Sequence, residues 1–212
     1  MGVLVRSDSI AHLTPVGRDA MVAYGITTVI DLRTDGELLR APNPCADNAG
    51  PVYRHLPLID DSMMLGLGEA SGMFERYLWM LDGRLQAFRP IFETVAEADG
   101  GVVFHCFAGK DRTGLVAAML LSIAGVPDDA IAADFAETDA QLALRYEEWM
   151  AAAPPERRIE MREEFRCPPE RILGVMDHIQ ERWGGVHGYM ESTGMTLTTI
   201  DRLRAKLDSS IR

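Results

Sequence analysis

The sequence predicts an α/β fold in which a central sheet of about four to five strands is flanked by helices and the C-terminal half is helical. Three observations support this prediction. A capped helix, a glycine and a β-branched run follow one another over residues 14–32. A short apolar run at 102–105 is followed by a loop and an apolar helix. After Asp128 every segment between prolines and glycines has helical patterning.

The first unit begins at Thr14-Pro15, where a capping threonine precedes a proline suited to the first helical position. This helix is expected to end near Gly25, and the run 26–32 to form a strand. Residues 42–51 are rich in proline, asparagine and glycine and predict a loop. A second strand is expected over 52–59, interrupted by Pro57.

The middle of the chain leads to the second strand-loop-helix unit. The small, acidic and Met-rich segment 60–72 predicts a mobile loop, and apolar residues at helical spacing predict one helix over 73–98. A buried strand at 102–105, a loop at 106–112 and a helix at 113–124 then follow. The expected C-terminal helices span 128–152, 155–165, 168–184, 186–193 and 196–209. We expect all 212 residues, 1–212, to form one domain.

Charge and cysteine content exclude several classes of protein. The formal net charge of -11 disfavours a general nucleic-acid binder, so an anionic substrate must be drawn by a local cluster of donors. Three scattered cysteines indicate a reducing compartment and not a disulfide framework. The N-terminus has no long apolar run, and 114–126 is too short to span a bilayer. We therefore expect a cytoplasmic protein without stable membrane insertion, with non-classical secretion left open.

The segment 102–114, VVFHCFAGKDRTG, carries the chemistry. Five residues separate Cys106 from Arg112, which gives a tight loop in which Gly109 permits a turn that other residues resist. The amides of this loop, residues 106–112, can point inward, and the following helix adds its positive end. The result is an anion cradle of phosphate size, and we call residues 106–112 the cradle loop. Its expected substrate-binding residues, besides Arg112, are Phe107, Ala108, Gly109, Lys110 and Thr113.

Each part of the cradle loop has a use in phosphate ester hydrolysis. The Cys106 thiolate would attack phosphorus and form a phosphocysteine, while Arg112 and the amides stabilise the transition state. Thr113 can donate to the cysteine sulfur, and His105 is expected to orient the loop backbone. The alternative is a silent phosphate-binding module, but the presence of both Cys106 and Arg112 counts against it. No metal-ligand spacing occurs, and no metal or other cofactor is expected.

The stretch HCFAGKDRTG, with TTVIDLR upstream and GGVHGYMESTGMT near the C-terminus, resembles the bacterial tyrosine-protein phosphatase family with a Cys-x-x-Gly-Lys-Asp-Arg loop. The resemblance runs from about Arg6 to Leu207. It implies a cysteine-phosphatase-like sheet, phosphotyrosine proteins as substrates, and phosphoinositides as a second class of substrate. It also implies that Lys110 meets extra phosphates of inositol lipids. Some relatives carry a long helical lid after the second strand, and the short segment 60–72 disfavours a large lid here.

Two assignments stay open on the sequence alone. The general acid is Asp111 inside the loop, which the family also implicates, or the Asp60/Asp61 pair after the second strand. Arg33 either reaches the substrate or forms a structural ion pair with Asp31 or Asp35. The helix 142–150 carries Tyr146, Trp149 and Met150, which either cover the site or belong to the core.

Overall fold

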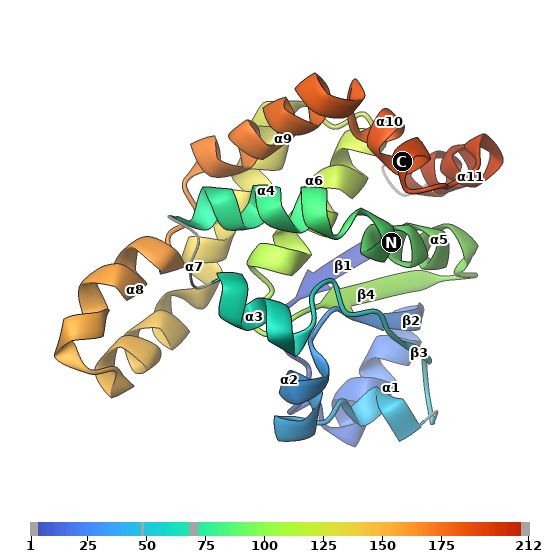
Figure 1. Ribbon diagram of the computed structural model, residues 1–212. Helices are drawn as coiled ribbons and strands as arrows, with labels where there is room; N and C mark the ends of the chain where they lie inside the picture. The colour runs from blue at the N-terminus through green and yellow to red at the C-terminus, as the bar shows by residue number, and fades with distance from the viewer. Residues whose placement is uncertain (1–3, 48, 68–71, 209–212) are drawn as a thin grey trace.

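The computed structural model describes residues 4–47, 49–67 and 72–208, and it shows a four-stranded sheet flanked by helices (Figure 1). The sheet order is β1 (Leu4–Ser7), β4 (Gly101–His105), β2 (Ile26–Asp31) and β3 (Val52–His55). All three pairings are parallel, so the carboxyl ends of the strands meet at one edge of the sheet. The predicted α/β class is confirmed. Strand β1 was not predicted, because its four residues are only partly buried and have no distinctive pattern.

The two faces of the sheet support two apolar cores, because successive side chains of β4 point to opposite sides. Val102 and Phe104 enter the larger core, which contains most of the buried apolar side chains of the helices. Val103 enters the smaller core together with Ile26 and Cys45. Figure 1 accordingly shows α1 (Pro15–Ala23) and α2 (Asp35–Arg40) on one side of the sheet, and α5 (Leu85–Glu97) and α6 (Asp111–Ile123) on the other.

Sequence signals placed the ends of α1 well. The Thr14 hydroxyl accepts a hydrogen bond from the Gly17 amide at 3.1 Å, and Pro15 occupies the first helical position. Among its described residues, the predicted loop 42–51 contains a short 3-10 turn, η1 (Pro44–Asp47). β3 ends four residues earlier than the predicted strand 52–59, since Pro57 has no amide hydrogen for the ladder.

Two predictions between β3 and β4 were wrong. The expected mobile loop 60–72 contains helix α3 (Asp61–Leu67), and its residues 68–71 lie outside the described part of the chain. The expected helix 73–98 is two helices, α4 (Met73–Gly83) and α5, separated at Arg84. Arg84 leaves the helical conformation, with φ of -121° and ψ of 24°, directly after a glycine that weakens the helix.

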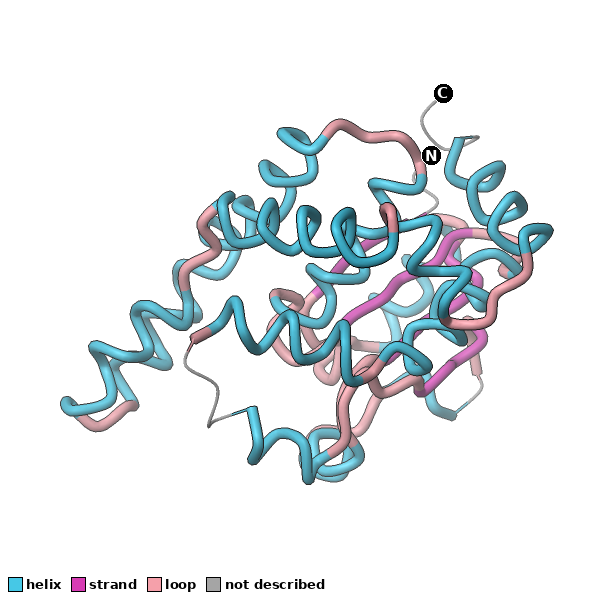
Figure 2. Tube along the Cα trace, turned by 45° about the horizontal axis from the view of Figure 1, so that its top comes forward, coloured by secondary structure: helices cyan, strands magenta, loops and turns pink. Residues whose placement is uncertain are grey.

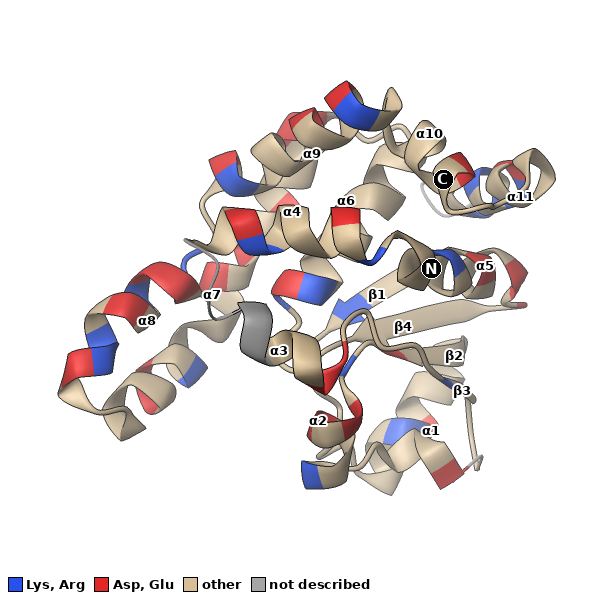
Figure 3. Cartoon of the chain, viewed as in Figure 1, with Lys and Arg blue, Asp and Glu red and all other residues tan. Residues whose placement is uncertain are grey.

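The C-terminal half is helical, as predicted. It comprises α7 (Asp128–Ala152), η2 (Pro155–Arg157), α8 (Arg158–Phe165), α9 (Pro169–Trp183), α10 (Val186–Ser192) and α11 (Leu197–Asp208). Figure 2 shows α8 and the end of α7 extending away from the sheet as a helical arm. Acidic and basic side chains alternate along α8 (Figure 3), which is typical of a solvated helix. Within the described ranges, no helix is long and apolar enough to cross a bilayer.

Candidate active site

The cradle loop joins the central strand β4 to helix α6 at the carboxyl edge of the sheet. Cys106 directly follows β4 and is 2% exposed. Helix α6 begins at Asp111, two residues earlier than predicted, so Arg112 lies in its first turn. The first amide groups of a helix have no hydrogen-bond partner within the helix, so those of Asp111 and Arg112 can take part in the cradle loop. The predicted order of strand, loop and helix is confirmed.

Arg112 is fixed by a carboxylate that sequence reasoning missed. Its Nη1 and Nη2 atoms donate to the two carboxylate oxygens of Glu37 at 2.5 and 2.8 Å. Glu37 belongs to a capping box at the start of α2, in which it also accepts from the Thr34 amide at 2.8 Å. The spacing Thr34-x-x-Glu37 signals the capping box. Nothing in the sequence connects Glu37 with Arg112, which lies 75 positions away.

The buried Glu37–Arg112 pair should make stability depend on pH. Burial alone would raise the pKa of Glu37, but the hydrogen bonds and charge of Arg112 outweigh it, so this pKa lies below its ordinary value of 4.5. A carboxyl whose pKa is lower in the folded state stabilises the fold above the unfolded-state pKa. That contribution is lost as the pH falls through the folded-state value.

We expect Glu37→Gln to lower the free energy of unfolding at neutral pH by about 3 kcal/mol, because Arg112 keeps its buried charge without a counter-ion. The variant should also lose less stability than the wild type between pH 5 and the acid limit of folding. Urea unfolding at several pH values measures both effects. Glu93→Gln, which breaks the more exposed Arg89–Glu93 pair, is the matched control and should change stability little. If the free energy of unfolding of wild type and of Glu37→Gln falls equally with decreasing pH, the prediction is contradicted.

Asp111 faces a cavity of about 330 Å³ next to the cradle loop. Its carboxylate accepts a hydrogen bond from the Tyr77 hydroxyl at 2.5 Å and lies 3.2 Å from the Lys110 ammonium. Burial opposes ionisation of Asp111, but the charge of Lys110 and the Tyr77 hydrogen bond dominate and lower its pKa. The cavity is also lined by Arg112 and by Ile59, Met64, Met73, Arg76, Met80, Arg157, Glu160 and Glu164.

The rival acids, Asp60 and Asp61, make other contacts. Asp61 accepts from the Thr34 hydroxyl at 2.5 Å and from the Gly36 amide at 2.8 Å, so it holds the start of α2. Asp60 accepts from Ser62 and Met63 and so caps α3. These hydrogen bonds lower the pKa of both carboxyls, and neither residue lines the cavity at Asp111. The geometry therefore favours Asp111 as the proton donor.

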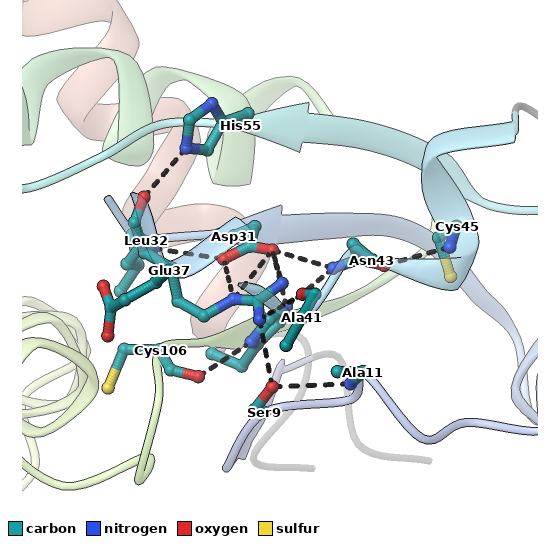
Figure 4. A network of polar contacts seen from close by, with 12 residues as sticks. Ser9, Ala11, Asp31, Leu32, Glu37, Ala41, Asn43, Cys45, His55 and Cys106 are labelled. Atoms are coloured by element: carbon teal, nitrogen blue, oxygen red, sulfur yellow. Dashed lines mark hydrogen bonds and ion pairs between the residues drawn. The ribbon is translucent and has the colours of Figure 1, made fainter. Parts of the chain in front are cut away.

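Arg33 forms the structural ion pair that the sequence offered as an alternative to substrate contact. The residue is fully buried, and its guanidinium donates to Asp31 at 2.7 and 2.9 Å and to the Ala41 carbonyl at 2.8 Å. Figure 4 labels Asp31, Ala41 and Ser9, which are the partners of Arg33, and marks the contacts with dashed lines. Each nitrogen of its guanidinium has a hydrogen-bond partner within the protein, which favours the structural role of Arg33 over contact with the substrate.

The same polar network fixes His105, as the sequence led us to expect. His105 is fully buried, and burial lowers its pKa, which favours the neutral ring. Its Nε2 lies 3.0 Å from the Asn43 amide nitrogen, a donor, so we infer that Nε2 is the unprotonated acceptor. Nδ1 then carries the hydrogen and donates to the Cys106 carbonyl at 3.1 Å. Through this hydrogen bond His105 orients the loop backbone at Cys106.

Lys110 does not extend into solvent, where it could meet extra phosphates. It is 4% exposed, and its ammonium donates to the Glu164 carbonyl at the end of α8. The helical arm is further attached by the Arg76–Glu164 ion pair at 2.8 Å.

Two aromatic residues of α7 lie next to the cradle loop or the arm. The Trp149 ring stacks on the half-exposed Phe107 ring, with 5.7 Å between their centroids. The Tyr146 ring stacks on Phe165 of α8.

Thr113 is fully buried at the start of α6, and its hydroxyl has no partner among the described residues. Donation by this hydroxyl to the Cys106 sulfur stays a prediction. All three cysteines, Cys45, Cys106 and Cys167, are unpaired and buried. In the ranges that the structure describes, no group of three His, Cys, Asp or Glu side chains could hold a metal ion.

Comparison with known proteins agrees with this geometry. The model of a tyrosine phosphatase family matches residues 1–208. A tyrosine-protein phosphatase of Nostoc commune is 30% identical over 96% of this chain and 73% of its own length. The triple specificity protein phosphatase PtpB of Mycobacterium tuberculosis is 28% identical over 97% of this chain and 91% of its own. With its cysteine and arginine on one loop at the sheet edge, the chain thus belongs to the tyrosine phosphatase family and is a phosphatase of the protein-tyrosine-phosphatase type.

Proposed function

We propose that the protein hydrolyses phosphomonoesters through a phosphocysteine on Cys106. The observation that carries this proposal is the placement of Cys106 and Arg112 at the two ends of one tight loop, with Arg112 oriented by both carboxylate oxygens of Glu37. In the first step the Cys106 sulfur attacks phosphorus, an S–P bond forms and the P–O bond to the leaving group breaks. Arg112 and the loop amides stabilise the charge on the equatorial oxygens.

Asp111 supplies the proton that the leaving oxygen needs. In the second step it accepts a proton from the water that attacks the phosphocysteine, which releases inorganic phosphate and restores the thiolate. Its low pKa in the free enzyme suits the base role. A bound phosphate dianion opposes ionisation of the neighbouring carboxyl and raises its pKa, which suits the acid role. The Thr113 hydroxyl, for which no described residue is a partner, stabilises the sulfur as it leaves phosphorus.

Phosphotyrosine proteins are the proposed substrates. Phe107 is 48% exposed and stacks on Trp149, which offers an aromatic surface beside the cradle loop for an aryl phosphate. Phosphoinositides are the second candidate, which the resemblance of the cradle loop to its family implies. They would require Lys110 to leave its contact with the Glu164 carbonyl. A cytoplasmic location stays a prediction from the cysteine content.

Phosphate release from a phosphotyrosine peptide and from a soluble phosphoinositide, with EDTA present, tests this proposal. We expect turnover of the peptide, and acid quenching early in the reaction should trap a covalent phosphoenzyme. Preferred turnover of the phosphoinositide would reverse the order of the substrates. Binding of the peptide with no turnover of either substrate would overturn the proposal and leave a silent phosphate-binding module.

A further inference from the structure

The outer side of the cradle loop is covered by β1 and the residues that follow it. The Ser9 amide donates to the Phe107 carbonyl at 3.0 Å, and the Arg6 guanidinium donates to the Gly109 carbonyl at 2.8 Å. The same segment touches the loop at Gly109, where a Cβ atom would lie 2.5 Å from the Ser7 carbonyl oxygen. Gly109 also has a φ of +68°, which glycine adopts without steric cost.

These two hydrogen bonds determine which way the loop amides point. In a trans peptide the carbonyl of one residue and the N–H of the next point in opposite directions. The carbonyls of Phe107 and Gly109 are held outward, so the amides of Ala108 and Lys110 face the inner side of the loop. The amide orientation that an anion cradle needs therefore depends on donors from outside the loop.

Arg6 is itself held in a single position by helix α7. Its guanidinium donates to the Asp134 carboxylate at 2.6 Å, to the Asp134 carbonyl at 3.2 Å and to the Thr138 hydroxyl at 3.1 Å. The side chain is 20% exposed, so the donor to Gly109 is shielded from most competition by water.

We propose that Arg6 is a positioning residue for the phosphatase reaction. By holding the Gly109 carbonyl outward, it keeps the Lys110 amide directed at the phosphate and so contributes to transition-state stabilisation without touching the substrate. This inference rests on the proposed function. It assigns β1, and the part of α7 that contains Asp134 and Thr138, a role in positioning the cradle loop that the sequence alone did not indicate.

The test compares Arg6→Met, Arg6→Lys and the control Arg18→Met. Arg18 resembles Arg6 in exposure (19%), in its ion pair with Asp47 at 2.7 Å and in its contact with a backbone carbonyl, but it lies on α1, away from the cradle loop. Each variant is assayed for kcat and KM on a phosphotyrosine peptide and for inorganic phosphate binding by calorimetry. Unfolding in urea gives the folded fraction under the assay conditions, and all values refer to folded protein.

We expect Arg6→Met to lower kcat about tenfold or more, with a smaller change in KM, because a misdirected amide weakens contacts to the transition state most. Phosphate binding should weaken, Arg6→Lys should recover part of both losses, and Arg18→Met should match the wild type. Equal kcat and phosphate affinity in Arg6→Met and wild type would overturn the inference. Asp134→Asn, which loosens Arg6 without removing it, should show a smaller kcat loss and replaces Arg6→Met if that variant does not fold.

The measurement of phosphate binding separates this inference from the proposed function. If the wild type binds phosphate but turns over no substrate, the proposed function fails, while weaker phosphate binding by Arg6→Met would still support the positioning role. If the wild type turns over substrate and Arg6→Met does so equally well, only the positioning role fails.

Discussion

Cys106→Ser should abolish measurable phosphate release, with a loss on the order of 10⁴-fold or more. A serine hydroxyl at this position keeps the volume and most contacts of the thiol, but it is a far weaker acid and is not ionised at neutral pH. The loop amides and Arg112, which bind the phosphate, are unchanged. The variant should therefore still bind a phosphotyrosine peptide, which calorimetry measures alongside the kinetic assay.

Cys45→Ser is the matched control for this variant. Cys45 is as buried as Cys106, but it lies in the small core on the other face of the sheet, and burial raises the pKa of its thiol. Its replacement should cost some stability and leave kcat close to that of the wild type. Turnover by Cys106→Ser at more than a small fraction of the wild-type rate would contradict the phosphocysteine mechanism.

The sequence predicted the chemistry where the site is contiguous. Cys106, Gly109 and Arg112 belong to one loop, so their spacing alone fixes a tight turn between a strand and a helix. The long helix α7, predicted at 128–152, is observed at Asp128–Ala152, because Pro127 and Pro154 bound it on both sides. Local signals of this kind are strong, since the backbone itself responds to proline and glycine.

Long-range partners could not be predicted from the sequence in the same way. Glu37 contacts Arg112 across 75 positions, and Arg6 contacts Gly109 across 103. Only the parallel pairing of β1 and β2 with β4 brings these residues to the same edge of the sheet. The sequence also could not decide among the three aspartates, because Asp61 meets the Thr34 hydroxyl and the Gly36 amide only when the chain folds.

Asp111→Asn should lower kcat by about 10²- to 10⁴-fold on a phosphotyrosine peptide, because the tyrosine oxygen must be protonated as it leaves. The loss should be much smaller on an activated aryl phosphate whose phenol is far more acidic than tyrosine, since that oxygen leaves without a proton. The fall of wild-type activity at high pH, which follows from ionisation of the acid, should disappear in the variant. Rate measurements with a series of aryl phosphates across pH test these expectations.

The control variants are Asp60→Asn and Asp61→Asn, which keep a side-chain oxygen that can accept hydrogen bonds at the helix starts. Each removes only the carboxylate charge and should cost about 0.5 kcal/mol of stability. Both should keep the wild-type dependence of rate on the leaving group. Tyr77→Phe removes the hydrogen bond that lowers the pKa of Asp111, so that pKa should rise and the high-pH limb should move upward with it. If Asp60→Asn or Asp61→Asn instead acquires the steep leaving-group dependence, the proton comes from the segment after β3 and Asp111 serves the cradle loop by its charge alone.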